Sequence, residues 1–433
     1  MKYAIISALV AVSVFSGAAA PRVDTSDVTM SQDPHSRVVT VTYTLKEEPG
    51  VITLDIQTNN AAGGWASIGD GNIRLLGGAV NRLVDELDVQ QTITWHAAQS
   101  WGGRKIAAGD IRAVVKAWAT NAPPDYMVVD LEEPFAVFYY PSEAALPRPV
   151  SDRIYKTGKL VMRKVPAAGV IWRMGISDAD DQTPHYVQLD EDYYLGVYPL
   201  TRQQYYLMNN KVNASYGYER AETAEGEDER SRACGALSFA SLRGSLKGLE
   251  WPNGARHEVD AGSAIDRLRK MTGLFFDLPT EAQWQFACRA GCGSDLYTGK
   301  DYSEAEVARL AWFDTNSKVM TAAGTEKSGT HEVGLKLQNA WGFYDMLGNV
   351  SELCLDRYSI VNYTGNASDV MKNPEGPEDA AATSRVCCGG NAWYSNNRSF
   401  FTSGARLEFK TTSDPYYSNY YGARLWAPAH AVK

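Results

Sequence analysis

The sequence lacks clustered basic residues and has no apolar run of transmembrane length. Lys and Arg number 42 against 51 Asp and Glu, which gives a net charge of −9. Nucleic acids and anionic membrane surfaces attract proteins through clustered cations, so neither is expected as a partner. We predict that the protein binds no nucleic acid and has no membrane span.

Motifs of several enzyme classes are also missing. The chain has no GxSxG segment of a serine hydrolase and no phosphate-binding glycine loop. Its six histidines include no HxxxH pair, and its six cysteines include no CxxC pair, so a zinc site is not favoured. By contrast, 11 Trp, 24 Tyr and 37 Gly indicate a loop-rich globular protein packed by aromatic side chains.

Residues 1–20 have the three-part composition of a secretory signal peptide. Lys2 provides a positive start, a mostly apolar run follows, and small residues end the segment at Ala20. We therefore predict export to the periplasm, the cell surface or the medium. Export makes the six cysteines candidates for disulfide bonds, but sequence alone does not choose among the possible pairings.

Residues 21–140 have the pattern of a small all-β sandwich of immunoglobulin or fibronectin III type. Strand-like runs rich in β-branched residues recur between turn signals, and Gly77–Asp88 is expected to be a loop or a short helix. Residues 141–158 are rich in proline and are predicted to form a linker. The strand-like runs are Arg37–Leu45, Val51–Thr58 and residues 91–97, 111–119 and 126–131.

Helix start signals appear in the second half of the chain. Thr201 and Thr280 are expected to be N-caps, and Asp260–Thr272 has amphipathic spacing. Asn339–Tyr358 differs, because it crowds aromatic and apolar residues around glycines and adds acidic groups. It is too glycine-broken for a helix and too apolar for a solvated loop, so we expect a buried, irregular segment.

Several motifs, in order, resemble the formylglycine-generating enzyme family, also called the sulfatase-modifying factor family. The resemblance runs over residues 159–428 and implies an α+β, irregular, C-type-lectin-like fold preceded by the small all-β sandwich. The motifs that carry it are Leu278–Gly291, His331–Tyr358, Arg385–Asn391 and Tyr420–Leu425.

The resemblance also implies a structural calcium ion. Its ligands would be the side chains of Asp345 and Glu352 and the backbone carbonyls of Gly348 and Val350. Calcium prefers carboxylate and carbonyl oxygens on flexible loops. Alternatively, the two carboxylates accept hydrogen bonds from loop amides; calcium is favoured because burial of two carboxylates without it is costly.

The catalytic cysteines of the family are absent. Its copper-dependent oxidases carry two cysteines after a Gly-Gly-Ser segment, and such a thiolate pair suits Cu(I). Here the segment is Gly389–Asn391, and the two cysteine positions hold Tyr394 and Ser399. We therefore expect no copper. A disulfide from Cys387 or Cys388, with Cys354 as one candidate partner, is the ordinary expectation.

The C-terminal segment is rich in Tyr and Asn, as binding loops are. We predict that it recognises a carbohydrate or protein ligand; alternatively, many of its aromatic side chains belong to the core. The predicted ligand-binding residues are Trp393, Tyr394, Asn396, Arg398, Tyr416, Tyr417 and Asn419.

Three functions follow as hypotheses. The first is an exported binding or accessory module without oxidase activity. The second is an enzyme of the same superfamily, formylglycine-generating or otherwise a metal-dependent oxidase, that modifies a peptide or small molecule. The third is a sequence-diversified receptor, since some lectin-fold members of the superfamily vary in this C-terminal segment.

Overall fold

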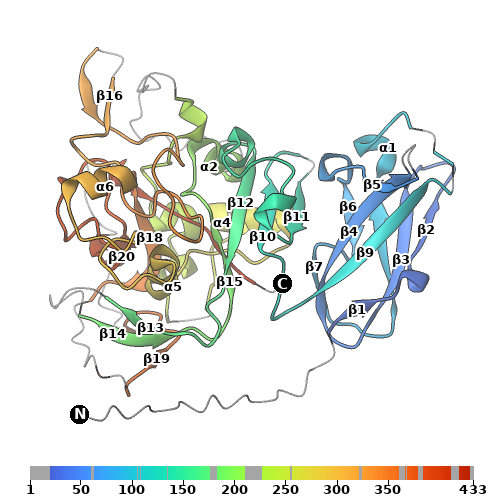
Figure 1. Cartoon of the computed structure of the whole chain (residues 1–433), viewed down its shortest axis with the longest axis horizontal. Helices are drawn as coiled ribbons and strands as arrows, with labels where there is room; N and C mark the ends of the chain where they lie inside the picture. Colours follow the sequence, from blue (N-terminus) through green and yellow to red (C-terminus); the bar gives the residue numbers. More distant parts are fainter. Residues whose placement is uncertain are drawn as a thin grey trace, which may run out of the picture.

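The structure is a computed structural model in which a β-sandwich precedes a larger α+β domain (Figure 1). In the described part of the chain, no helix is both long enough and apolar enough to cross a membrane. Tyr416, Tyr417 and residues 1–19 of the predicted signal peptide lie outside the described residues. These are 20–59, 63–104, 106–107, 109–133, 135–175, 183–209, 227–253, 256–320, 324–359, 366, 368–378, 384–410 and 419–429.

The sandwich consists of two sheets around one core. In β3, every second residue is buried, and Val41, Ile56, Ile93 and Trp95 meet between the sheets. Residues 77–88, expected to be a loop or a helix, instead include two short strands. The first sheet contains β1 (Arg22–Val23), β2 (Thr29–Gln32), β3 (Val39–Lys46), β6 (Leu76–Gly78) and β8 (Gln90–Trp95); the second contains β4 (Gly50–Asn59), β5 (Trp65–Ser67), β7 (Arg82–Val84) and β9 (Ile111–Ala119).

The last strand predicted for the sandwich, residues 126–131, belongs to the second domain. β10 (Tyr126–Asp130) pairs with β11 (Ala136–Tyr140) on one side and with β12 (Lys159–Val165) on the other. All five β10 residues are buried, as in a strand that is covered on both faces. Residues 141–158 thus connect two strands of one sheet and are not a linker between domains.

The second domain contains short helices, two of which begin at the predicted N-caps Thr201 and Thr280. The Thr280 hydroxyl oxygen accepts a hydrogen bond from the Gln283 backbone amide, and the Thr280 backbone amide donates one to the Gln283 side-chain oxygen. Thr201 caps another helix in the same way. The helices are α1 (Ala97–Ser100, in the sandwich), α2 (Arg202–Met208), α3 (Phe239–Arg243), α4 (Ala264–Thr272), α5 (Glu281–Arg289) and α6 (Glu304–Leu310).

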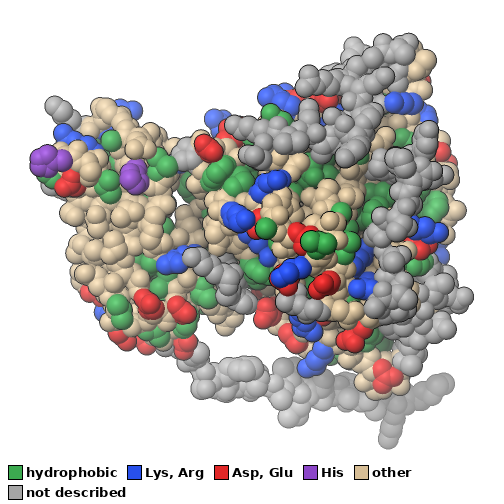
Figure 2. Space-filling view, turned by 180° about the vertical axis from the view of Figure 1, so that it is seen from behind, with side chains coloured by type: hydrophobic (Ala, Val, Ile, Leu, Met, Phe, Trp, Pro, Cys, Tyr) green, Lys and Arg blue, Asp and Glu red, His purple; other side chains and the backbone are tan. Residues whose placement is uncertain are grey.

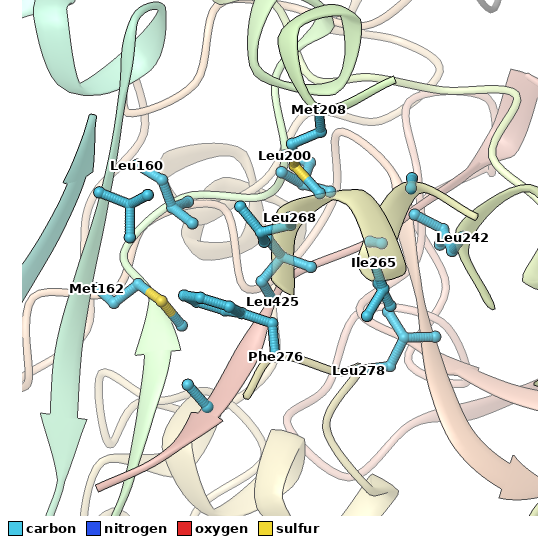
Figure 3. Close-up of a cluster of buried hydrophobic side chains, with 14 of the residues drawn as sticks. Leu160, Met162, Leu200, Met208, Leu242, Ile265, Leu268, Phe276, Leu278 and Leu425 are labelled. Carbon is cyan, nitrogen blue, oxygen red and sulfur yellow. The ribbon is translucent and has the colours of Figure 1, made fainter. Parts of the chain in front are cut away.

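Helix α4 supplies much of the main core. Ile265 and Leu268 point from it toward Phe276 and Leu425, and Met162 of β12 closes the cluster (Figure 3). The remaining strands are β13 (Ile171–Met174), β14 (His185–Gln188), β15 (Tyr193–Gly196), β16 (Lys318–Met320), β17 (Glu326–Ser328), β18 (Ser351–Arg357), β19 (Met371–Lys372), β20 (Arg385–Cys388), β21 (Arg406–Phe409), β22 (Tyr421–Gly422) and β23 (Trp426–Pro428).

The stretch Asn339–Tyr358 is irregular only in its first half. Its second half forms β18, which lies between β20 and β22, and all seven of its residues are buried. The prediction of an irregular segment was therefore wrong for β18. The glycines that break the pattern precede the strand, and they form the turn that leads into it.

Candidate functional site

A tight turn before β18 joins three segments. Asn349 adopts a positive φ of 62°; its side-chain oxygen accepts a hydrogen bond from the His331 amide at 3.0 Å, and its amide group donates to the His331 carbonyl at 3.2 Å. Gly348, at φ 77°, donates to the Gly389 carbonyl. A Cβ at Gly348 would lie 2.5 Å from the Trp312 carbonyl oxygen, so only glycine fits there.

A buried ion pair lies next to this turn. Arg424, fully buried, donates to both oxygens of Glu352 at 2.8 and 2.9 Å. The Trp284 indole donates to the same carboxylate at 2.6 Å. Arg424 also donates to the carbonyls of Gly196 and Tyr344, so its guanidinium joins four separate parts of the domain.

Glu352 does not fit the predicted calcium site in this arrangement. Arg424 already neutralises its carboxylate, and a calcium ion would have to compete with a buried guanidinium for the same oxygens. Asp345 accepts a hydrogen bond from the Gly334 amide at 2.6 Å, and burial raises the pKa of its carboxyl group. The roles assigned to Asp345, Gly348 and Val350 stay predictions.

Hydroxyl-bearing side chains occupy the two positions at which the resemblance places the family's cysteine thiolates. The Tyr394 ring lies 4.6 Å from the Phe400 ring and 5.8 Å from the Tyr420 ring, and burial raises the pKa of its phenol. Ser399 is exposed, and its amide donates to the Asn397 side chain. Neither side chain is a soft ligand of the kind that Cu(I) prefers.

Four aromatic side chains form what we call the aromatic cluster: Trp393, Tyr394, Phe400 and Tyr420. All four are half-buried, and Trp393 lies 5.0 Å from Tyr420 between ring centroids. The sequence prediction included Trp393 and Tyr394 but missed Phe400 and Tyr420 as site residues. Tertiary packing brings these four side chains together. The presence of several aromatic residues in the C-terminal segment was the sequence signal that could have indicated Phe400 and Tyr420 as well.

The predicted polar ligands have internal partners. Asn396 accepts a hydrogen bond from the Tyr302 hydroxyl, and Arg398 forms an ion pair with Asp295. Asn419 differs, because its side-chain oxygen is buried and has no hydrogen-bond partner in the described structure. It adjoins Tyr420 in sequence, so an unsatisfied acceptor lies at one end of the aromatic cluster.

No disulfide joins the six cysteines, all of which lie in described residues. The expected disulfide from Cys387 or Cys388 is therefore not observed. The Cys354 and Cys388 sulfur atoms are 4.0 Å apart, which is beyond bonding distance. Five of the six are buried, and burial raises the pKa of each of these thiols.

We expect a thiol reagent to modify Cys292 alone in the native protein, because it is the one cysteine that is partly exposed. After denaturation without reductant, all six thiols should react. Mass spectrometry of the alkylated protein checks both counts. Fewer than six modified thiols after denaturation would show that a disulfide forms.

A second buried carboxylate lies on β18. Asp356 accepts a hydrogen bond from the Glu281 amide at 2.7 Å, and the Glu281 side chain pairs with Arg406 at 3.0 Å. Burial and the neighbouring Glu281 carboxylate raise the pKa of Asp356 to about 7.

On the molecular surface, acidic and basic side chains are interspersed on the face shown in Figure 2. Among the described residues, no group of three or more His, Cys, Asp or Glu could hold a metal ion.

The second domain is an irregular α+β domain built around the buried strand β18. The chain belongs to the sulfatase-modifying factor enzyme 1-like family, whose domain matches residues 156–425. The predicted family is confirmed, as is the fold class.

The named relatives that the chain resembles include both a chaperone and an enzyme. The chain is 25% identical over 217 residues to the chaperone protein LppX of Paenibacillus barcinonensis, covering 47% of this chain and 70% of that protein. It is 30% identical over 115 residues to the formylglycine-generating enzyme of Thermomonospora curvata, covering 26% of this chain and only 37% of that enzyme. Among solved structures, Treponema denticola variable protein 1 aligns with a TM-score of 0.45 and 23% identity, over 62% of this chain and 95% of that chain.

Proposed function

We propose that the protein is exported and acts as a binding or accessory module that recognises a carbohydrate or protein ligand through the aromatic cluster. The observation that carries this proposal is the chemistry of two positions: Tyr394 and Ser399 stand where the resemblance places thiolates. The domain therefore keeps the family fold but presents a phenol and a hydroxyl group at the position of the copper ligands.

The aromatic cluster supports a role in recognition. Aromatic rings provide contact area with little loss of side-chain entropy, and they pack on the apolar faces of sugars and on peptide side chains. Trp393 and Tyr420 lie together and remain half-exposed.

We expect Trp393→Ala to weaken ligand binding by about tenfold or more, since an aromatic anchor contributes about 2 kcal/mol or more to an interface. The probes are a printed oligosaccharide array and a random-peptide array, followed by titration of the strongest hit. Trp65→Ala is the matched control, because Trp65 is also half-buried but lies on β5 of the sandwich.

Binding that survives in Trp393→Ala with unchanged circular dichroism would show that the ligand site is elsewhere. Loss of binding in both tryptophan variants would show a general effect on folding and would contradict the assignment to the aromatic cluster.

A further inference from the structure

Three cavities meet where the sandwich joins the second domain. Their volumes are about 790, 800 and 420 Å³, and Phe135 and Met271 line all three. We call the region formed by these three adjoining cavities the junction groove. One arm runs along the sandwich past Leu76, and the other runs along α2 past Tyr206 and Leu207. Its centre is apolar, and it lies far along the chain from the aromatic cluster.

Two edge strands face the smallest cavity. Leu76–Gly78 of β6 lines one wall, and Ala136 and Val137 of β11 line the other. β6 is the last strand of its sheet and pairs with β8 alone, while β11 is the last strand of the other sheet and pairs with β10 alone. Figure 1 shows β11 on the side of the second domain that faces the sandwich.

An edge strand presents unpaired backbone N–H and C=O groups, which an added strand can satisfy. Among the described strands, none pairs with the outer edge of β6 or of β11. A carbohydrate cannot reproduce the repeat of a polypeptide backbone, whereas an extended peptide can. The two edges therefore favour a peptide over a sugar as the occupant.

Contacts beside the groove hold its walls in place. Val51 of the sandwich packs in one core with Met127 and Val137 of the second domain. Arg74 of the sandwich pairs with Asp130 at 3.3 Å. A recess with fixed walls loses little entropy when a ligand binds, so the groove is suited to binding without rearrangement.

Charged residues of both signs line the groove. Glu133 lines two of the cavities, together with Arg74 in one and Arg267 and Lys270 in the other, and Arg82 lines the third. Glu133 and Arg82 are exposed, and neither forms an ion pair in the described structure. A bound segment with a basic residue near Glu133 and an acidic residue near Arg82 would match both charges.

We propose that the junction groove binds an extended peptide segment of a partner protein. The segment adds as a β-strand to the edge of β6 or β11 and places an apolar side chain between Phe135 and Met271. This site is separate from the aromatic cluster, so the chain would hold two ligands at once.

The test is selection of a random-peptide phage library on the whole protein, followed by fluorescence titration of the selected peptides. Met271→Glu should weaken their binding by about tenfold or more, because it puts a charge at the apolar centre. Arg82→Glu should weaken binding of those peptides that carry an acidic residue. Met320→Glu is the matched control, since Met320 is an exposed methionine on β16 and should leave binding unchanged.

Hydrogen exchange gives a second readout that does not depend on a variant. Bound peptide should slow amide exchange in Leu76–Gly78 or in Ala136 and Val137, as strand addition requires. Trp393→Ala should not alter peptide binding, which separates this site from the aromatic cluster.

A selection in which no peptide loses binding in Met271→Glu, or in which no peptide protects either strand edge, would overturn the proposal. Peptides that bind Met271→Glu normally but Trp393→Ala weakly are ligands of the aromatic cluster and test the proposed function instead. If Met271→Glu does not fold, Met271→Ala and the exchange experiment decide. Selection that yields no peptide, with an oligosaccharide bound instead and lost in the Met271 variant, would also overturn the assignment to a peptide.

Discussion

Replacing Arg424 with alanine is expected to lower the free energy of unfolding by about 3–5 kcal/mol, because it leaves the buried Glu352 carboxylate without its counter-charge. Chemical denaturation followed by tryptophan fluorescence measures the change. Arg230→Ala is the matched control: Arg230 pairs with Asp228 on the surface, where such pairs contribute about 0–1 kcal/mol.

The same variant tests the role of calcium. If Arg424 is the counter-charge of Glu352, a calcium chelator should leave the loss of stability caused by Arg424→Ala unchanged. A double variant, Glu352→Gln with Arg424→Met, should be more stable than Arg424→Ala, since it leaves no unpaired charge. A chelator that changes the loss caused by Arg424→Ala would contradict this account and would support Glu352 as a calcium ligand.

The contribution of Asp356 to the stability of the protein is expected to fall as the pH rises from about 4 to about 7. Burial beside Glu281 raises the folded pKa of Asp356 to about 7 from an ordinary value of 3.8. Within this window, the folded state keeps a proton that the unfolded state has lost, so each step up in pH favours unfolding. Three pKa units correspond to about 4 kcal/mol, and above the window the contribution is constant.

Thermal unfolding between pH 4 and pH 9 checks this dependence. Asp356→Asn should remove this contribution to the slope, because asparagine does not titrate. Asp125→Asn is the control, since Asp125 is exposed and its side chain should leave the slope in place. An Asp356→Asn profile identical to that of the unsubstituted protein would contradict the raised pKa.

Local chemistry explains what the sequence predicted well. Thr280 and Thr201 begin helices because each can accept a hydrogen bond from an amide three residues later, and this signal is complete within four residues. The alternating burial of β3 was visible for the same reason.

Pairing between distant segments explains what it missed. The first four residues of the run, Tyr126–Val129, are apolar, so the run fits a sandwich strand or a central strand equally well. Only its register with β12 assigns it to the second domain. Likewise, Glu352 and Arg424 are far apart in sequence. An arginine among glycine and apolar residues in the closing motif is a signal for a buried partner, but the partner is fixed only by tertiary packing.

The ligand-binding role of the candidate site stays a prediction. Of the residues predicted for it, Trp393 and Tyr394 lie in the aromatic cluster, whereas Asn396 and Arg398 are held by Tyr302 and Asp295 from outside the segment. The sequence of a loop shows which side chains can recognise a ligand. It does not show which of them are already used within the fold.

The most direct test of the central claim, recognition in place of thiolate oxidation, is incubation of the purified protein with a cysteine-containing peptide, copper and oxygen. The account predicts no aldehyde product, because Tyr394 and Ser399 supply no thiolate pair. Copper and oxygen form the peptide disulfide without the protein, so a sample that lacks the protein is the control. Conversion of the peptide cysteine to an aldehyde, detected by mass spectrometry, would contradict the account and would establish an oxidase.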